Sequence, residues 1–254
     1  MPRYFIEVAY KGTNYSGFQI QENSNTIQAE VEKAFQTFQR IPIQLTGSSR
    51  TDAGVHAIQN FFHFDFEEPV HPQALYKLNA ILPRDIAIRN IFPMPADAHS
   101  RFDALSREYC YRIHRFKDPF LTDRSLYYPY KLKYDHMQEG AVFLKSQQNF
   151  FAFAKTNTQV NTFNCTISKS EWELKENLLI YNIEGNRFLR GMVRSITATL
   201  LKLGRGQISL PEFESLFVEE RKCGFSIPSH GLYLKRVNYS QNYLPVTALP
   251  FTDF

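Results

Sequence analysis

Cysteine and metal-binding patterns are scarce in this chain of 254 residues. Its three cysteines are an odd, widely spaced set, so a disulfide framework is not expected and a reducing cytoplasm is the predicted compartment. The seven histidines form neither an HExxH motif nor a His-x3-5-His spacing, and no CxxC pair occurs. A structural or catalytic metal is therefore not expected.

Long apolar runs and the common nucleotide and hydrolase motifs are also missing. No stretch approaches the length of a transmembrane helix, and the N-terminal residues do not follow a signal-peptide pattern, so no membrane association is expected. Gly12 and Gly17 have the spacing of a phosphate-binding loop, but the Lys-Ser/Thr pair that must follow is absent. A G-x-S-x-G nucleophile motif is absent as well.

The composition that is present is that of an ordinary soluble globular protein. Hydrophobic residues make up 43% and charged residues 21% of the chain. The 23 Phe and 14 Tyr are explained first by packing. The net charge of +4, with an isoelectric point near 8.8, permits a nucleic-acid partner without requiring one.

Hydrophobic periodicity divides the chain into two halves of similar order. The first half is expected to contain strands at 3–10, 41–46, 59–66 and 86–92, and helices starting near 26 and spanning 72–81. The second half is expected to contain strands at 107–116, 165–174, 178–183 and 232–239, and helices at 135–146, 187–203 and 211–218. On the 59–66 strand, Phe62, Phe64 and Phe66 share one face, opposite Phe61 and His63.

Apart from the shorter helix at 211–218, each half thus runs strand, helix, strand, strand, helix, strand, which matches the split βαβ unit. We predict an α+β protein of two ferredoxin-like halves, 1–104 and 105–254, that join antiparallel sheets with helices on one face. The opposite face would then be open to a long ligand.

The stretch GSSRTDAGVHA, residues 47–57, holds one carboxylate, Asp52, beside Arg50. An aspartate in a glycine-bounded turn most often caps backbone N–H groups, and that alternative stays open here. If Asp52 is functional, a cation such as Arg50 or Arg194 would keep it ionised. Glycoside hydrolysis would normally need a second carboxylate, which the loop does not supply.

Two further features are compatible with either packing or RNA contact. On the expected helix at 187–203, Arg187, Arg190 and Arg194 recur at i, i+3 and i+7 and would share one face. That face is either simply solvated or contacts phosphate or carboxylate groups. Tyr109 is either a core residue of its strand or a ring that stacks on a flipped base.

The ordered motifs resemble those of the tRNA pseudouridine synthase family that modifies the anticodon arm, the TruA family. The resemblance covers nearly the whole chain. Its motifs, in order, are YKGTNYSGFQIQ, GSSRTDAGVHA, NAILPRDI, HSRFDALSREYCYRI, FLRGMVRSITATLLKLG and HGLYL.

The resemblance implies a role for each of four residues in a pseudouridine synthase fold. Asp52 matches the catalytic aspartate, and Arg194 matches the arginine that pairs with it. Tyr109 matches the tyrosine that stacks on the target base, and Arg50 matches a basic residue that helps to hold the RNA. The resemblance also implies a cofactor-independent homodimer that isomerises uridine to pseudouridine at tRNA positions 38–40. The alternatives are a glycosidase-like enzyme acting on free nucleosides and a catalytically inactive tRNA-binding protein or chaperone.

The sequence departs from the common family pattern at three places. Phe18 stands where many members carry Trp, and Ser48 and Ser49 replace a more usual Ala-Gly pair. Residues 164–166, NCT, occupy a region that often contains an arginine. None of these positions is Asp52, Tyr109 or Arg194.

Overall fold

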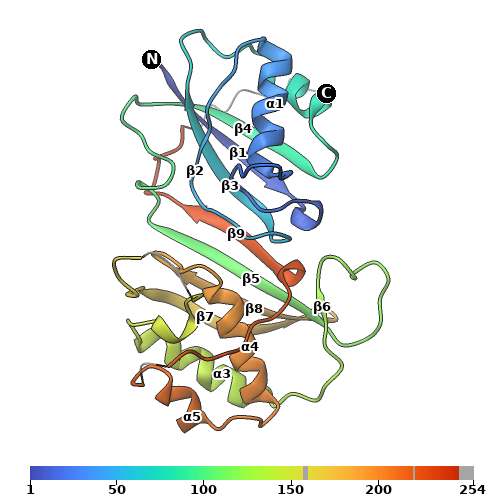
Figure 1. Cartoon of the computed structure of the whole chain (residues 1–254), viewed down its shortest axis with the longest axis vertical. Helices are drawn as coiled ribbons and strands as arrows, with labels where there is room; N and C mark the ends of the chain where they lie inside the picture. Colours follow the sequence, from blue (N-terminus) through green and yellow to red (C-terminus); the bar gives the residue numbers. More distant parts are fainter. Residues whose placement is uncertain (157–159, 220, 246–254) are drawn as a thin grey trace. The chain divides into compact units, whose positions relative to one another are not determined.

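The computed structural model describes residues 1–156, 160–219 and 221–245, and its contacts divide the chain into two compact units (Figure 1). Of the described residues, those of 1–105 and those from Leu234 onward form the N-terminal unit, and those of 106–233 form the C-terminal unit. The division predicted from the sequence instead ran the second half from 105 to 254. Within that range, 157–159, 220 and 246–254 lie outside the described residues. That each half is a ferredoxin-like domain stays a prediction.

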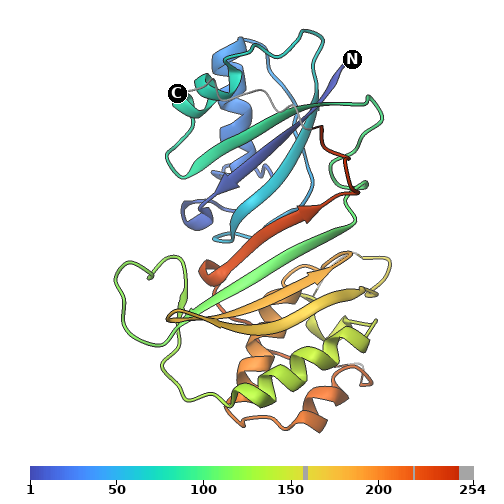
Figure 2. The same cartoon turned by 180° about the vertical axis from the view of Figure 1, so that it is seen from behind.

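The N-terminal unit is an antiparallel sheet covered by two helices. Its elements are β1 (Arg3–Tyr10), α1 (Ile27–Gln39), β2 (Thr46–Gly47), β3 (His56–Asp65), α2 (Ala74–Ile81), β4 (Ile86–Met94) and most of β9 (Leu232–Asn238). The strand order is β4-β1-β3, with β2 paired to β3, and all these pairs are antiparallel. Helix α1 lies in front of the sheet in Figure 1 and behind it in Figure 2, and α2 contacts both α1 and β4.

Helix α1 begins where the sequence predicts. The side-chain oxygen of Thr26 accepts a hydrogen bond from the Ala29 N–H at 3.3 Å, which satisfies one of the free donors of the first turn. Ile27, Val31 and Phe35 are buried, as their helical spacing requires. This helix therefore supplies the apolar layer over the sheet.

The strand expected at 41–46 is wrong except at its end, because only Thr46 and Gly47 pair with β3. The backbone of Leu45 bonds to side chains of α1 instead: its N–H donates to Glu32 at 2.9 Å, and its carbonyl accepts from Gln28 at 2.8 Å. These two bonds satisfy the groups that a strand ladder would have used.

Both faces of β3 are buried. Phe61 packs edge-on against Tyr239, with ring centroids 5.3 Å apart, and Phe5 contacts Tyr239 and Tyr243 on the same side. The Tyr239 hydroxyl donates to the carbonyl of Ser100 at 2.6 Å. The C-terminal segment thus covers the sheet face that carries Phe61, and this contact explains its grouping with the N-terminal unit.

The C-terminal unit contains three long antiparallel strands with helices packed on them. Its elements are β5 (Ser106–His114), β6 (Leu126–Tyr127), α3 (Tyr134–Phe143), β7 (Ile167–Lys175), β8 (Leu178–Gly185), α4 (Met192–Gly204) and α5 (Leu210–Ser215). The strand order is β5-β8-β7, both pairs are antiparallel, and the short β6 runs parallel to β5. Helix α3 contacts α4 and β7. The predicted α+β class is confirmed.

Candidate active site

Asp52 lies in the loop between β2 and β3 of the N-terminal unit. The Val55 N–H donates to the Asp52 carbonyl at 3.2 Å and closes a tight turn, in which Gly54 has φ +75°. Glycine adopts such a φ without the steric cost that a Cβ atom brings. Thr51 and Val55 are buried while Asp52 is half-buried, so the loop is anchored on both sides of the carboxylate.

Buried polar groups on the sheet fix the start of this loop. The Asn60 side chain donates to the carbonyl of Ser49 at 2.9 Å and to the Tyr10 hydroxyl at 3.2 Å. The Tyr10 hydroxyl also bonds to the Thr51 hydroxyl at 2.8 Å. Because Asn60 and Thr51 are buried, losing one partner would leave polar groups unsatisfied. This network holds the backbone of the loop in place on the N-terminal side of Asp52.

The segment KGTNYSGF, residues 11–18, packs on the other side of the loop. The Gly12 N–H donates to His56 Nδ1 at 3.0 Å, and the Gly54 N–H donates to the carbonyl of Tyr15 at 3.3 Å. A Cβ on Gly12 would lie 2.0 Å from the Val55 carbonyl oxygen, so no larger residue fits there. The first motif of the chain therefore supports the second.

Phe18 belongs to the same support. Its ring stacks on Phe62, with centroids 4.4 Å apart and an interplanar angle of 11°, and it is 1% exposed. A Cβ on Gly47 would lie 2.1 Å from the Phe18 ring, so the glycine makes room for the stack. The departure from Trp at this position thus falls in the core behind the loop, whereas Arg50 on the loop itself is exposed.

Tyr109 lies on β5 of the C-terminal unit, opposite Ile183 of β8. It is 9% exposed, and its ring meets Phe188 edge-on with centroids 5.2 Å apart. Tyr111 is two residues further along β5, so both tyrosines point to the same side of the strand.

Arg194 lies in the first turn of α4, and a main-chain carbonyl holds its guanidinium. Its Nε–H donates to the carbonyl of Ile227 at 2.7 Å, and the Tyr111 hydroxyl donates to the next carbonyl, that of Pro228, at 2.7 Å. Burial raises the pKa of Tyr111 above its usual value, and the nearby charge of Arg194 opposes this shift. Since Nε is engaged, contact with an anion falls to the two terminal nitrogens of Arg194.

The predicted arginine face of a 187–203 helix is wrong, because α4 begins at Met192. Gly191 has φ +73°, and its carbonyl accepts the first helical bond, from Ser195, at 3.0 Å. Arg187 and Arg190 therefore precede the helix, and the i, i+3, i+7 relation with Arg194 does not apply to them. The amphipathic pattern extends upstream of Met192, and such a pattern does not reveal that a glycine in the left-handed conformation precedes the helix.

The four predicted residues are divided between the units. Arg50 and Asp52 share one loop of the N-terminal unit, and Tyr109 and Arg194 belong to the C-terminal unit. Sequence reasoning missed the residues that fix them in place, chiefly Tyr10, His56, Asn60 and Tyr111. A weak signal existed for Asn60, because an amide inside a phenylalanine-rich strand must find buried partners.

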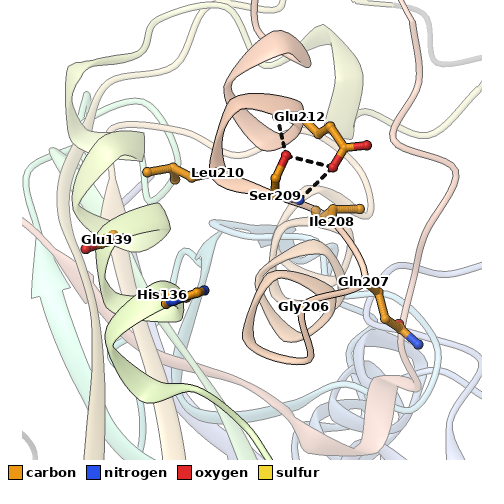
Figure 3. A pocket seen from close by; sticks show the side chains of 8 residues that line it. All are labelled: His136, Glu139, Gly206, Gln207, Ile208, Ser209, Leu210 and Glu212. Atoms are coloured by element: carbon orange, nitrogen blue, oxygen red, sulfur yellow. Dashed lines mark hydrogen bonds between the residues drawn. The ribbon is translucent and has the colours of Figure 1, made fainter.

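A pocket of about 390 Å³ lies elsewhere in the C-terminal unit, between α3 and the turn that leads into α5 (Figure 3). It is lined by His136, Glu139, Gly206, Gln207, Ile208, Ser209, Leu210 and Glu212. Ser209 and Glu212 bond to each other as the N-terminal cap of α5. None of the predicted site residues lines this pocket.

The described residues contain neither a metal-binding cluster nor a membrane-spanning helix. Among the described residues, no group of three or more His, Cys, Asp or Glu side chains is arranged to hold a metal ion. No helix in this part of the chain is both long and apolar enough to cross a bilayer.

The chain belongs to the tRNA pseudouridine synthase family. The family model matches residues 6–103 and 147–240, so it spans Arg50 and Asp52 in its first segment and Arg194 in its second, while Tyr109 lies between them. Several relatives carry the name tRNA pseudouridine synthase A. One from Parabacteroides distasonis is 40% identical over 97% of this chain and 99% of its own length. One from Porphyromonas gingivalis is 41% identical over 94% and 98%, and one from Staphylococcus aureus is 33% identical over 95% and 92%.

Proposed function

We propose that this protein isomerises uridine to pseudouridine in tRNA, in the anticodon arm. The observation that carries the proposal is the family match over both units, together with relatives of that name that align over nearly the whole chain. The hydrogen bonds that hold the loop at Ser49 and Thr51, next to Asp52, support it, since a reacting group must be held in place to act.

The chemistry needs a single carboxylate. The bond between ribose C1′ and uracil N1 breaks, the base rotates, and a bond from C1′ to C5 forms. The C5 proton is lost and N1 gains a proton, so the reaction consumes no water. Asp52 acts either as the nucleophile or as the base that removes a ribose proton. Because uracil leaves as a delocalised anion, the site needs no strong general acid at that step.

The other candidates receive their roles from the resemblance. From the resemblance, Arg194 would pair with the Asp52 carboxylate and keep it ionised. Tyr109 stacks on the flipped base, and Arg50 contacts the RNA backbone. Asp52 and Arg194 belong to different units, so this pairing rests on the family pattern.

We further propose that the protein is a cytoplasmic homodimer that acts without a cofactor. Affinity for tRNA would come mainly from phosphate contacts, and selectivity would come from RNA shape and from the cost of extruding the target base.

The experiment uses a tRNA transcript carrying tritium at uracil C5. The wild-type protein should release tritium, Asp52→Asn should release none, and Asp97→Asn, at an exposed aspartate of the same unit, should match the wild type. Equal release from Asp52→Asn would remove Asp52 from the mechanism. Binding of tRNA without release by the wild type would favour the inactive RNA-binding protein, and turnover of free uridine would favour the glycosidase-like enzyme.

Tyr109→Phe separates stacking from proton transfer. The ring and its contact with Phe188 should persist, so RNA affinity should change little. We expect turnover to fall at a late proton-transfer step. Unchanged turnover would leave the hydroxyl without a role.

A further inference from the structure

The loop at 115–124, RFKDPFLTDR, leaves the end of β5 and leads to β6 in the C-terminal unit (Figures 1 and 2). Its two phenylalanines are almost fully exposed: Phe116 at 77% and Phe120 at 76%. Phenylalanine is among the residues most often buried in soluble proteins. Two such rings on one loop indicate a ligand-binding surface, because exposing apolar side chains to water is unfavourable.

Hydrogen bonds give this loop a defined shape. The Phe120 N–H donates to the Asp118 carboxylate at 2.8 Å, and the Ser125 N–H donates to the carbonyl of Leu121 at 3.0 Å. The Tyr233 hydroxyl donates to the carbonyl of Arg124 at 2.7 Å and ties the loop to the unit. The exposure of the two rings is therefore a property of an ordered loop.

Cations accompany the exposed rings. Arg115 and Lys117 flank Phe116 in the sequence, and both are exposed. The loop has three cations and two acids, so its net charge is positive. Asp123 lies 3.5 Å from the Arg124 guanidinium, and the Asp118 carboxylate accepts from the Phe120 N–H. The loop thus offers positive charge and aromatic faces together.

The chain that follows continues this composition. Tyr127 and Tyr130 are 49% and 48% exposed, and Lys131 is exposed beside Tyr130. The Arg205 guanidinium lies 4.0 Å from the centre of the Tyr130 ring, as in a cation–π contact. Rings interleaved with cations are the pattern by which proteins hold single-stranded nucleic acid.

We propose that the 115–124 loop is an RNA-contact element in which Phe116 and Phe120 stack on unpaired bases and Arg115 and Lys117 contact phosphates. This inference rests on the proposed function, which supplies the RNA, and it concerns nucleotides other than the uridine that reacts. A second copy of the chain fits the loop less well. Two phenylalanines bury roughly 300–500 Å² in total, well below the roughly 800 Å² per partner of a stable interface. Lysine is also depleted at protein interfaces.

The first test measures affinity for an anticodon-arm hairpin RNA by fluorescence anisotropy. Replacing both rings in Phe116→Ala/Phe120→Ala should weaken binding about tenfold or more, as loss of base stacking does. Phe116→Leu/Phe120→Leu keeps apolar side chains but removes the aromatic faces, and it should weaken binding as well. Phe116→Tyr/Phe120→Tyr keeps the aromatic faces, so this variant should bind the RNA as the wild type does. Val218→Ala is the matched control, because Val218 is 86% exposed in another part of this unit.

The second test uses salt. Arg115→Ala/Lys117→Ala should flatten the plot of log Kd against log salt by about one to two units, since each lost phosphate contact removes about one. The leucine pair should leave this slope unchanged. Wild-type slope in the charge variant, or wild-type affinity in the alanine and leucine pairs, would overturn the proposal.

Sedimentation of the same variants tests the rival occupant. If Phe116→Ala/Phe120→Ala lowers the oligomeric state while RNA affinity stays at the wild-type value, the loop is a subunit contact and the proposal is wrong. The proposed function is judged separately by tritium release. Wild-type protein that binds the hairpin through the loop but releases no tritium would defeat the proposed function alone. Loop variants that bind and turn over as the wild type does would defeat this inference alone.

Discussion

The bond between Gly12 and His56 offers a sharp test of how the loop that carries Asp52 is held. The Gly12 N–H donates to His56 Nδ1 at 3.0 Å, and both residues are buried. Because the amide can only donate, Nδ1 must carry the lone pair. In His56→Asn the amide oxygen can replace Nδ1, whereas in His56→Gln the longer side chain places its oxygen nearer to the position of Nε2.

The expected magnitude follows from the buried donor. Leaving the Gly12 N–H without an acceptor should cost about 1–3 kcal/mol of unfolding free energy. We therefore expect His56→Gln to lose that much in urea unfolding and His56→Asn to recover at least half of it. Activity should follow the same order, because displacing a reacting group by about 1 Å can cost on the order of a hundredfold in rate.

The assay combines urea unfolding with kcat from tritium release, and Gly12→Ala perturbs the same contact from the other side. The added Cβ would lie 2.0 Å from the Val55 carbonyl oxygen, so the two segments must separate and both readouts should fall. Equal stability and kcat in His56→Asn and His56→Gln would refute the role of this bond. So would wild-type behaviour of Gly12→Ala.

Three further predictions concern other parts of the two units. Burial and the charge of a neighbouring histidine lower the pKa of His63 to about 4, below its unfolded value of about 6.5, so the unfolded chain takes up the proton first. The unfolding free energy should thus be unaffected by His63 above about pH 6.5 and should fall by up to roughly 3 kcal/mol as the pH drops towards 4. In urea titrations at several pH values, His63→Asn should make the unfolding free energy depend less on pH. The same pH dependence in the variant as in the wild type would contradict this prediction. Arg194→Lys removes the Nε donor to the Ile227 carbonyl and the planar guanidinium. Tritium release should fall at least tenfold, while the unfolding free energy should drop by only about 1 kcal/mol. Full activity of this variant would exclude the guanidinium from the reaction. Gly47→Ala should lower the unfolding free energy by about 1–3 kcal/mol, because its Cβ would lie 2.1 Å from the Phe18 ring. In a double-mutant cycle, Phe18→Leu should relieve part of this loss. Additive effects of the two substitutions would show that the strain arises from another contact.

Local patterns were sufficient for most elements of the fold. The capped start of α1 at Thr26 is encoded within a few residues, as is the alternation of β5, and both are found near the predicted positions. The α+β class followed from the order of these elements. The strand predicted at 41–46 failed because the backbone of Leu45 bonds to side chains of α1 instead of a neighbouring strand. The contact between Tyr239 and Phe61 joins residues far apart in sequence, and local patterns do not predict such contacts.

The candidate site shows the same division. Asp52, Tyr109 and Arg194 were named because their motifs resemble those of a family, and local chemistry alone left each of them with a structural alternative. The partners of the supporting groups could not be named in advance, since Tyr10, Asn60 and Thr51 meet only when β1, β3 and the loop are assembled. The same limit applies to α4, where one left-handed glycine moved Arg187 off the helix.

The main proposal is that the protein converts uridine to pseudouridine in tRNA with Asp52 as the reacting carboxylate. The most direct test is to incubate an unmodified tRNA transcript with the wild-type protein or with Asp52→Asn and to map pseudouridine by mass spectrometry. We expect pseudouridine on the 3′ side of the anticodon stem-loop with the wild type and none with the variant. Pseudouridine formed equally by Asp52→Asn, or its absence with a wild-type protein that binds the transcript, would contradict it.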